Sequence, residues 1–369
     1  MIDTIMLTIP LGSFYVIKTS RFTPNARNAI TLFGNEECRC YQHASKDDLK
    51  AGIYKPKLTI SKKRMQGGMS ISLLIEFSVP KLIFGNNFNE VTEEHFDTII
   101  QALQDTLFSM AVKVETDVLM NAKVVRVHYS KNLVITEHST CTEIIKVLGK
   151  SDISRRLDVS RTSYKNHGEI VRYHASSYEL TFYDKLKDLQ TAIKLSEKRA
   201  FERQGRMQSE FLQRAVGEEV LRMEFRINDM DKLKDDVFPK MEIEYPEPTF
   251  RNLFNKELSR RTCLHFWNIA HTASHSVIAA QDASSTAFEN LIHFGYKPEK
   301  AAAIAQGFEL IRRGFSMREI KNMSATWYKS IEEARGQMNL ERSYLYSAFL
   351  NIGKLLDSFE PLSFSNFNL

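Results

Sequence analysis

Four segments of the sequence alternate apolar and polar residues with the period of two that is typical of a half-buried β-strand. They are residues 71–79, 122–130, 178–185 and 220–227. In each segment the polar face carries charged or reactive side chains. Two of these are glutamates in mid-strand, Glu76 and Glu224, where glutamate is disfavoured. Together the four polar faces carry Glu76, Arg126, His128, Tyr183, Lys185, Arg222, Glu224 and Arg226.

These residue types fit the transfer of a phosphodiester to tyrosine if the four strands share one sheet. Glu76, His128 and Glu224 offer ligands for a divalent ion such as Mg²⁺ or Mn²⁺, and that ion would polarise the phosphodiester. The Tyr183 oxygen would attack phosphorus and give a covalent intermediate. Because a free phenol has a pKa of about 10, a cation such as Lys185 is needed to lower it. Neighbouring phosphates would be held by Arg126, Arg222 and Arg226.

The same pattern also has a plain structural interpretation. A mid-strand glutamate between arginines often forms a cross-strand ion pair on a solvated face, and a single strand histidine is more often exposed than metal-bound. The chain has 13 tyrosines, so composition does not select Tyr183. Tyr173 is a rival nucleophile, whereas Tyr178 points to the apolar face of its strand. The alternation alone leaves both interpretations open.

The elements that must position these residues fall into two regions. Residues 1–240 mix short alternating runs with helical patterns in no regular βαβ order, which predicts an α+β domain with a largely antiparallel sheet and helices on one face. Two prolines within residues 241–249 indicate a linker. Residues 250–369 are rich in helical patterns, so we expect a mainly helical second domain.

The second region contains a pattern that resembles a helix-turn-helix. Gly314 is expected to end one helix, and Ser316 with Glu319 forms a capping box that opens the next. A third helix follows, with Lys329 and Arg335 exposed for contact with the major groove of DNA. A generic helical bundle would show the same pattern.

The bulk composition permits a nucleic-acid partner without requiring one. The chain has 369 residues, 43% of them hydrophobic, and a net charge of +5. Four cysteines form no disulfide framework, and no apolar run reaches the roughly 20 residues that cross a bilayer. The first residues carry no signal-peptide pattern. We therefore expect a protein of the reducing cytoplasm with no membrane partner.

Five sequence blocks, in this order and spacing, resemble the gene II-type replication initiators of filamentous phages and their plasmid relatives. The blocks are MIDTIML at 1–7, IEFSVPKLIFGNN at 75–87, RVHYSKN at 126–132, YELTFYDKLKDL at 178–189 and LRMEFRI at 221–227. The resemblance implies a rolling-circle nuclease fold and a magnesium-dependent enzyme that nicks circular double-stranded DNA at an origin. It also implies a 5′ end held on tyrosine, later rejoining of the displaced single strand, and host replication proteins as partners.

Residue by residue, the resemblance implies that Tyr183 is the nucleophile with Lys185 beside it, and that Glu76 and Glu224 are the acidic residues of the site. The chain departs from the family at His128, where relatives tend to have aspartate. A histidine can still bind a metal, but it adds pH dependence. The segment after residue 79 could bring Lys81 and the turn at 85–87 to the DNA backbone, although a plain turn has the same sequence.

Three functions are compatible with these observations. The first is a tyrosine nickase that starts rolling-circle replication. The second is a DNA-binding regulator of phage or plasmid replication that keeps the fold without the chemistry. The third is a metal-dependent nuclease that activates water and forms no covalent bond. All three expect the four polar strand faces to meet on one side of one sheet.

Overall fold

The computed structural model covers residues 1–369. The structure describes all of them except 32–35, 67, 137–138, 155–156, 158–160, 166–168, 199–211, 214, 216, 245, 283–286, 335–339, 341–342 and 368–369.

A sheet of nine antiparallel strands forms the centre of the described structure, in the order β3-β4-β5-β1-β7-β11-β10-β9-β8. The strands are β1 Ile2–Pro10, β3 Cys38–Gln42, β4 Lys57–Met65, β5 Gly68–Ser78, β7 Lys123–Val134, β8 Arg161–Lys165, β9 Ile170–His174, β10 Tyr178–Asp184 and β11 Val220–Ile227. A separate short pair joins β2 (Tyr15–Val16) to β6 (Val112–Lys113). The expected α+β class and antiparallel sheet are confirmed.

All four alternating segments are strands of this sheet, and three of them lie side by side. β11 pairs with β7 on one side and with β10 on the other. In that register Glu224 lies opposite Ser130 and Thr181, and Tyr183 lies opposite Arg222. Cross-strand partners point to the same face of a sheet, so the polar faces of these strands do adjoin. β10 ends at Asp184, however, and the next residue begins a helix.

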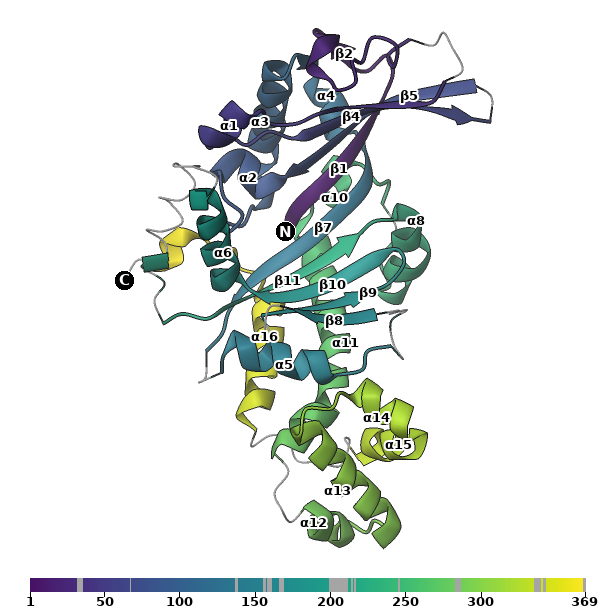
Figure 1. Ribbon diagram of the computed structural model, residues 1–369, viewed down its shortest axis with the longest axis vertical. Coiled ribbons are helices and arrows are strands. Elements are labelled where there is room, and N and C mark those ends of the chain that lie inside the picture. The colour runs from purple at the N-terminus through teal and green to yellow at the C-terminus, as the bar shows by residue number, and fades with distance from the viewer. Residues whose placement is uncertain are drawn as a thin grey trace.

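The apolar face of the sheet packs against helices. α11 (Lys256–Asp282) runs behind the central strands in Figure 1, and the ring of its Phe266 stacks on Phe225 with centroids 3.8 Å apart. Trp267 of the same helix meets Phe182. The other helices of this part are α1 Lys46–Lys50, α2 Val79–Phe84, α3 Phe96–Ser109, α4 Thr116–Met120, α5 Cys141–Lys150, α8 Met230–Lys232, α9 Phe238–Lys240, α10 Phe250–Leu253 and α16 Tyr344–Ser358.

One helix departs from the expected arrangement on a single face. α6 (Lys185–Lys198) packs with Leu186 and Leu189 on Phe88 and on Val220, and Val220 shares the strand face of Glu224. The 3₁₀ turn Phe364–Phe367 adds its two phenylalanines to this small core. One end of the polar face is therefore covered by a second apolar cluster.

The C-terminal region is mainly helical, as expected. It adds α12 (Ala287–His293), α13 (Pro298–Arg312), α14 (Met317–Met323) and α15 (Ala325–Ala334), which extend beyond the lower end of the sheet in Figure 1. Gly314 has a φ of 111° just after α13, and Ser316 and Glu319 form the predicted capping box. One apolar cluster runs without a break from the sheet into α11, α13, α15 and α16.

None of the described helices combines the length and the apolar character needed to cross a membrane.

Candidate active site

Tyr183 and Glu224 meet on neighbouring strands. The Tyr183 hydroxyl donates a hydrogen bond of 2.7 Å to Oε1 of Glu224, and the tyrosine is only 8% exposed. Burial, and then the adjacent Glu224 carboxylate, raise the pKa of Tyr183 well above its ordinary value. In this arrangement the phenol therefore keeps its proton and shares it with a carboxylate.

Two arginines clamp the Glu224 carboxylate. Oε1 also accepts from Nε of Arg222 at 2.9 Å, and Oε2 accepts from Nε and Nη2 of Arg226 at 2.9 and 2.5 Å. Burial alone would raise the pKa of the Glu224 carboxyl, but the two guanidinium groups outweigh burial and hold that pKa well below its usual range. Both oxygens are thus occupied by protein donors, and an added metal ion would have to displace one of them.

Arg222 is buried at the centre of the network, with 2% of its side chain exposed. All five of its N–H groups donate to protein oxygens: those of Asp3, Asn87, Ser130, Asn132 and Glu224. A guanidinium with five protein acceptors has no donor left for a phosphate. Arg222 therefore positions carboxylates in this arrangement, whereas the predicted partner Arg226, 28% exposed, lies at the open side.

Asp3 is a member of the site that sequence reasoning missed. Its Oδ1 accepts from Nη2 of Arg222 at 2.7 Å, so Arg222 bridges the carboxylates of Asp3 and Glu224. The available signal was a carboxylate inside the first alternating strand, in the same block that carries the family resemblance. Aspartate is depleted in strands, and that depletion could have marked the position.

Lys185 lies beside the phenol although it is not on the strand. It is the first residue of α6, fully buried, with Nζ 5.6 Å from the centre of the Tyr183 ring and 2.9 Å from Oδ2 of Asp188. Burial, and then the positive charge of Arg222, lower the pKa of Lys185. The predicted cation therefore lies next to the predicted nucleophile. Its position follows from the start of α6, whereas the sequence predicted that it would lie on the strand.

His128 and Glu76 lie on the same sheet face at increasing distance from Tyr183. His128 pairs across the sheet with Arg226, and burial, followed by that arginine, lowers its pKa to about 4. Glu76 is two strands from β7, with Oε1 3.8 Å from Arg126 and Oε2 3.8 Å from Lys57. Strand spacing and register place Glu76 roughly 20 Å from Glu224. These contacts of Glu76 are the ones that the ion-pair interpretation predicts.

The predicted metal ligands do not gather at one point. Of the residues described, a single group of three offers ligand atoms that all lie within 4.8 Å: Cys141, Asp184 and Glu219. This buried cluster could hold a metal ion. It lies on the opposite face from Tyr183, because Asp184 follows it in strand alternation and Cys141 begins α5.

The chemistry of this cluster favours a soft ion. Burial, and then Asp184, raise the pKa of the Cys141 thiol far above its ordinary value. The Lys187 ammonium already lies 3.3 Å from Oδ2 of Asp184. A thiolate suits zinc, whereas Mg²⁺ and Mn²⁺ prefer oxygen ligands. The cluster is therefore a poor match for the magnesium that the family resemblance implies.

The rival tyrosines are core residues. The Tyr173 hydroxyl donates to the carbonyl of Leu148 at 2.5 Å, and burial raises its pKa. Tyr178 packs its ring against Phe225 and Phe266 on the apolar face. Neither hydroxyl lies on the face that carries Glu224, so of these three tyrosines Tyr183 has the acid–base partner.

The remaining predicted DNA contacts are dispersed. Arg126 is half-buried beside Glu76, and Lys81 is half-buried in α2, which ends at Gly85 with a φ of 68°. Lys329 is exposed on α15, and Arg335 lies outside the described residues. Of the described side chains, Arg126 lies on the sheet face of Tyr183, whereas Lys81 and Lys329 lie on the helices α2 and α15.

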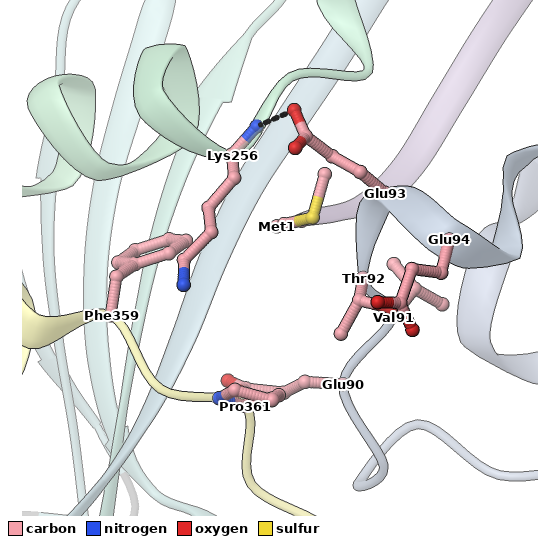
Figure 2. Close-up of a pocket in the computed structure, with 9 residues that line it drawn as sticks. All are labelled: Met1, Glu90, Val91, Thr92, Glu93, Glu94, Lys256, Phe359 and Pro361. Atoms are coloured by element: carbon pink, nitrogen blue, oxygen red, sulfur yellow. Dashed lines mark hydrogen bonds between the residues drawn. The ribbon is translucent and has the colours of Figure 1, made fainter.

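A cavity near the start of β1 does not extend the site. Its volume is about 320 Å³, and Figure 2 shows Glu93 and Glu94 at its edge, with Oε1 of Glu93 accepting from the backbone N–H of Lys256 at 2.7 Å. Glu90 also lines it and forms a buried ion pair with Lys131. Glu93 and Glu94 lie against one lining lysine, so the described lining has no excess of positive charge that would attract a phosphate.

The blocks that resemble gene II-type initiators include the strands that build this site. The block at 178–189 forms β10 and the start of α6, the block at 221–227 forms most of β11, and the first block contributes Asp3. No protein-family model, curated protein or solved structure matches the chain.

Proposed function

We propose that the chain is a site-specific DNA nickase and strand transferase that starts rolling-circle replication by joining the cut strand to Tyr183. The observation that carries the proposal is the 2.7 Å hydrogen bond from the Tyr183 hydroxyl to Glu224, beside two buried cations, Arg222 and Lys185, and the partly exposed Arg226. A nucleophile needs a positioned base, and a phosphoryl transfer needs fixed positive charge. Glu224 fits the first need, and Arg222, Arg226 and Lys185 fit the second.

The reaction follows from these contacts. The Tyr183 oxygen bonds to phosphorus, the bond from phosphorus to the 3′ oxygen breaks, and the 3′ oxygen leaves with the bonding electrons. The phenolic proton passes to Glu224, which already accepts it in a hydrogen bond. The 5′ phosphate stays on Tyr183 until a 3′ hydroxyl attacks it in reverse and rejoins the strand.

Arg226 couples the binding of DNA to the basicity of Glu224. It lies at the open side of the network and holds Oε2 of Glu224. A phosphate that attracts Arg226 away from Glu224 removes one of the two charges that depress the carboxyl pKa. Glu224 then becomes a stronger base at the moment when the substrate is present.

The metal requirement is a separate part of the proposal. The family resemblance implies Mg²⁺ or Mn²⁺, with Glu76, His128 and Glu224 as ligands, but these residues are not gathered in this arrangement and no step is assigned to an ion. The implied partners are origin DNA, both as duplex and as displaced single strand, and host replication proteins in the cytoplasm.

A denaturing gel tests the proposal. Labelled single-stranded oligonucleotides tiled across the DNA around the chain's own gene are incubated with the protein in Mg²⁺, in Mn²⁺ or in EDTA. We expect a covalent protein–DNA band that Tyr183→Phe abolishes and Tyr173→Phe retains. Peptide mapping of the band should place the nucleotide on Tyr183.

Other outcomes identify the alternatives. Cleavage without an adduct would support a nuclease that activates water, and binding without cleavage would support a regulator. An adduct that survives Tyr183→Phe would overturn the assignment of the nucleophile.

A further inference from the structure

A polar groove lies between α5, which packs on the sheet, and the C-terminal helices. It has a volume of about 740 Å³ and is lined by the end of α5 and by the turn from α13 into α14. Nζ of Lys150 donates to the carbonyl of Ile311 at 3.0 Å, which fastens the two walls together. We call this feature, formed by residues 146–152 and 314–322, the junction groove.

Positive charge is concentrated at the junction groove. The cations on its walls and on the adjacent end of α13 are Lys146, Lys150, Arg312, Arg313, Arg318 and Lys321. Lys146 and Lys150 are one helical turn apart on α5, and the charge of Lys146 contributes, after burial, to lowering the pKa of Lys150. Two like charges held this close favour binding of an anion between them.

The carboxylates of the same region are already engaged by the protein. Glu309 pairs with both arginines at the end of α13, and Glu319 caps α14 through Ser316. Asp152 accepts from Ser154 and lies 3.7 Å from Lys321. By contrast, within the described part of the chain Lys146 and Arg318 have no ion-pair partner. Two uncompensated cations therefore face the groove.

The lining chemistry selects a phosphate backbone as the occupant. Asn322 also lines the groove, and amide side chains are among the groups that contact phosphate and sugar oxygens. Among the described lining residues there is no aromatic ring on which an unpaired base could stack. The groove therefore fits the backbone of double-stranded DNA better than a single strand.

We propose that the junction groove binds the phosphate backbone of duplex DNA, with Lys146 and Arg318 as its contacts. This deepens the proposed function, on which it rests for the identity of the polymer. It gives the duplex a docking surface separate from the chemistry at Tyr183, next to the three-helix unit α13–α15.

Salt-dependent binding tests this inference. The full chain is titrated with a short fluorescent duplex of arbitrary sequence, and the logarithm of the association constant is plotted against that of salt concentration. The double variant Lys146→Gln/Arg318→Gln removes two phosphate contacts, so the slope should fall in magnitude by about 1.8 and binding should weaken by roughly 10- to 60-fold at about 0.1 M salt.

A matched double variant distinguishes the loss of contacts in the groove from the loss of two positive charges anywhere on the protein. Lys50→Gln/Lys113→Gln removes two exposed cations, one on α1 and one on the strand that pairs with β2, and it should keep the wild-type slope. Both α1 and β2 lie at the opposite end of the molecule from α14 in Figure 1. Equal slopes for the groove variant and the wild type, or equal losses in the two double variants, would overturn the proposal. A loss confined to single-stranded probes would overturn the duplex assignment.

The result does not depend on the nicking chemistry. Tyr183→Phe should bind the duplex with the wild-type slope, because its hydroxyl lies on the other face of the sheet. If the groove variant shows the expected loss while no adduct ever forms, the groove stands and the nickase fails. If adducts form on single strands but the slope is unchanged, the nickase stands and the groove fails.

Discussion

Replacement of Glu224 by glutamine is the most direct test of the buried network. The carboxylate accepts from Tyr183, Arg222 and Arg226, and glutamine keeps the shape while removing the negative charge. Arg222 retains Asp3, but its buried charge loses one of two carboxylates. Removing one partner of a buried ion pair costs about 3–5 kcal/mol, so we expect Glu224→Gln to lower the free energy of unfolding by about that amount.

Urea unfolding at neutral pH measures this loss, and Glu76→Gln is the matched control. Glu76 lies on the same sheet face, but its ion pairs are longer and more exposed, so its replacement should cost less than about 1 kcal/mol. If Glu224→Gln lowers the free energy of unfolding as little as Glu76→Gln does, the buried ion pairs of Glu224 with Arg222 and Arg226 are refuted. The argument that these arginines set the basicity of Glu224 would fail with them.

The pH dependence of the same variant has a defined sign. The folded-state pKa of Glu224 is depressed, so its stabilising contribution is complete above the unfolded value of about 4.3 and is lost as pH falls through the folded value. The free-energy difference between wild type and Glu224→Gln should therefore shrink below about pH 4. A difference that is constant with pH would contradict a charged Glu224 in the native state.

Four further predictions concern His128, Gly307, Gly353 and the cluster of Cys141, Asp184 and Glu219. The pKa of His128 is lowered to about 4 from its ordinary 6.5, so protonation of His128 should account for about 3 kcal/mol of the stability that the wild type loses as pH falls from 6.5 to 4, and His128→Gln should lose that much less over the same range. A Cβ at Gly307 would lie 2.3 Å from Cδ1 of the buried Ile331, so Gly307→Ala should destabilise by about 1–3 kcal/mol in thermal unfolding. Gly353→Ala, with its nearest atom at 3.5 Å, should stabilise by about 0.5–1 kcal/mol. Excess Zn²⁺, but not Mg²⁺, should raise the melting temperature, and Cys141→Ser should remove that rise.

The sequence predicted the strands and their faces because alternation reports directly on which side of a sheet a residue points. It therefore brought Tyr183 and Glu224 to one face, where β10 and β11 are in fact paired. Alternation does not report strand order, and for that reason Glu76 was expected near Glu224 although β1 and β7 separate their strands. The order of strands that are distant in the sequence comes from long-range packing, which alternation within one strand does not encode.

Two other differences have local causes. Lys185 was assigned to a strand because its polar side chain continues the period of two, yet Asp184 accepts a hydrogen bond from the backbone N–H of Lys187 and favours a helix start. The Cys141, Asp184 and Glu219 cluster unites residues from three distant segments with no ligand spacing in the sequence, so only the folded chain reveals it.

The site as folded holds the proposed nucleophile in a resting state. Tyr183 is buried and protonated, and Arg222 and Arg226 together make Glu224 a weak base. Of those two arginines, Arg222 has every N–H group committed to the protein, whereas Arg226 is partly exposed. A phosphate can therefore recruit Arg226 at a much smaller desolvation cost than Arg222. Activation by the substrate itself follows from this asymmetry, because the group that leaves Glu224 is also the group that the phosphate attracts.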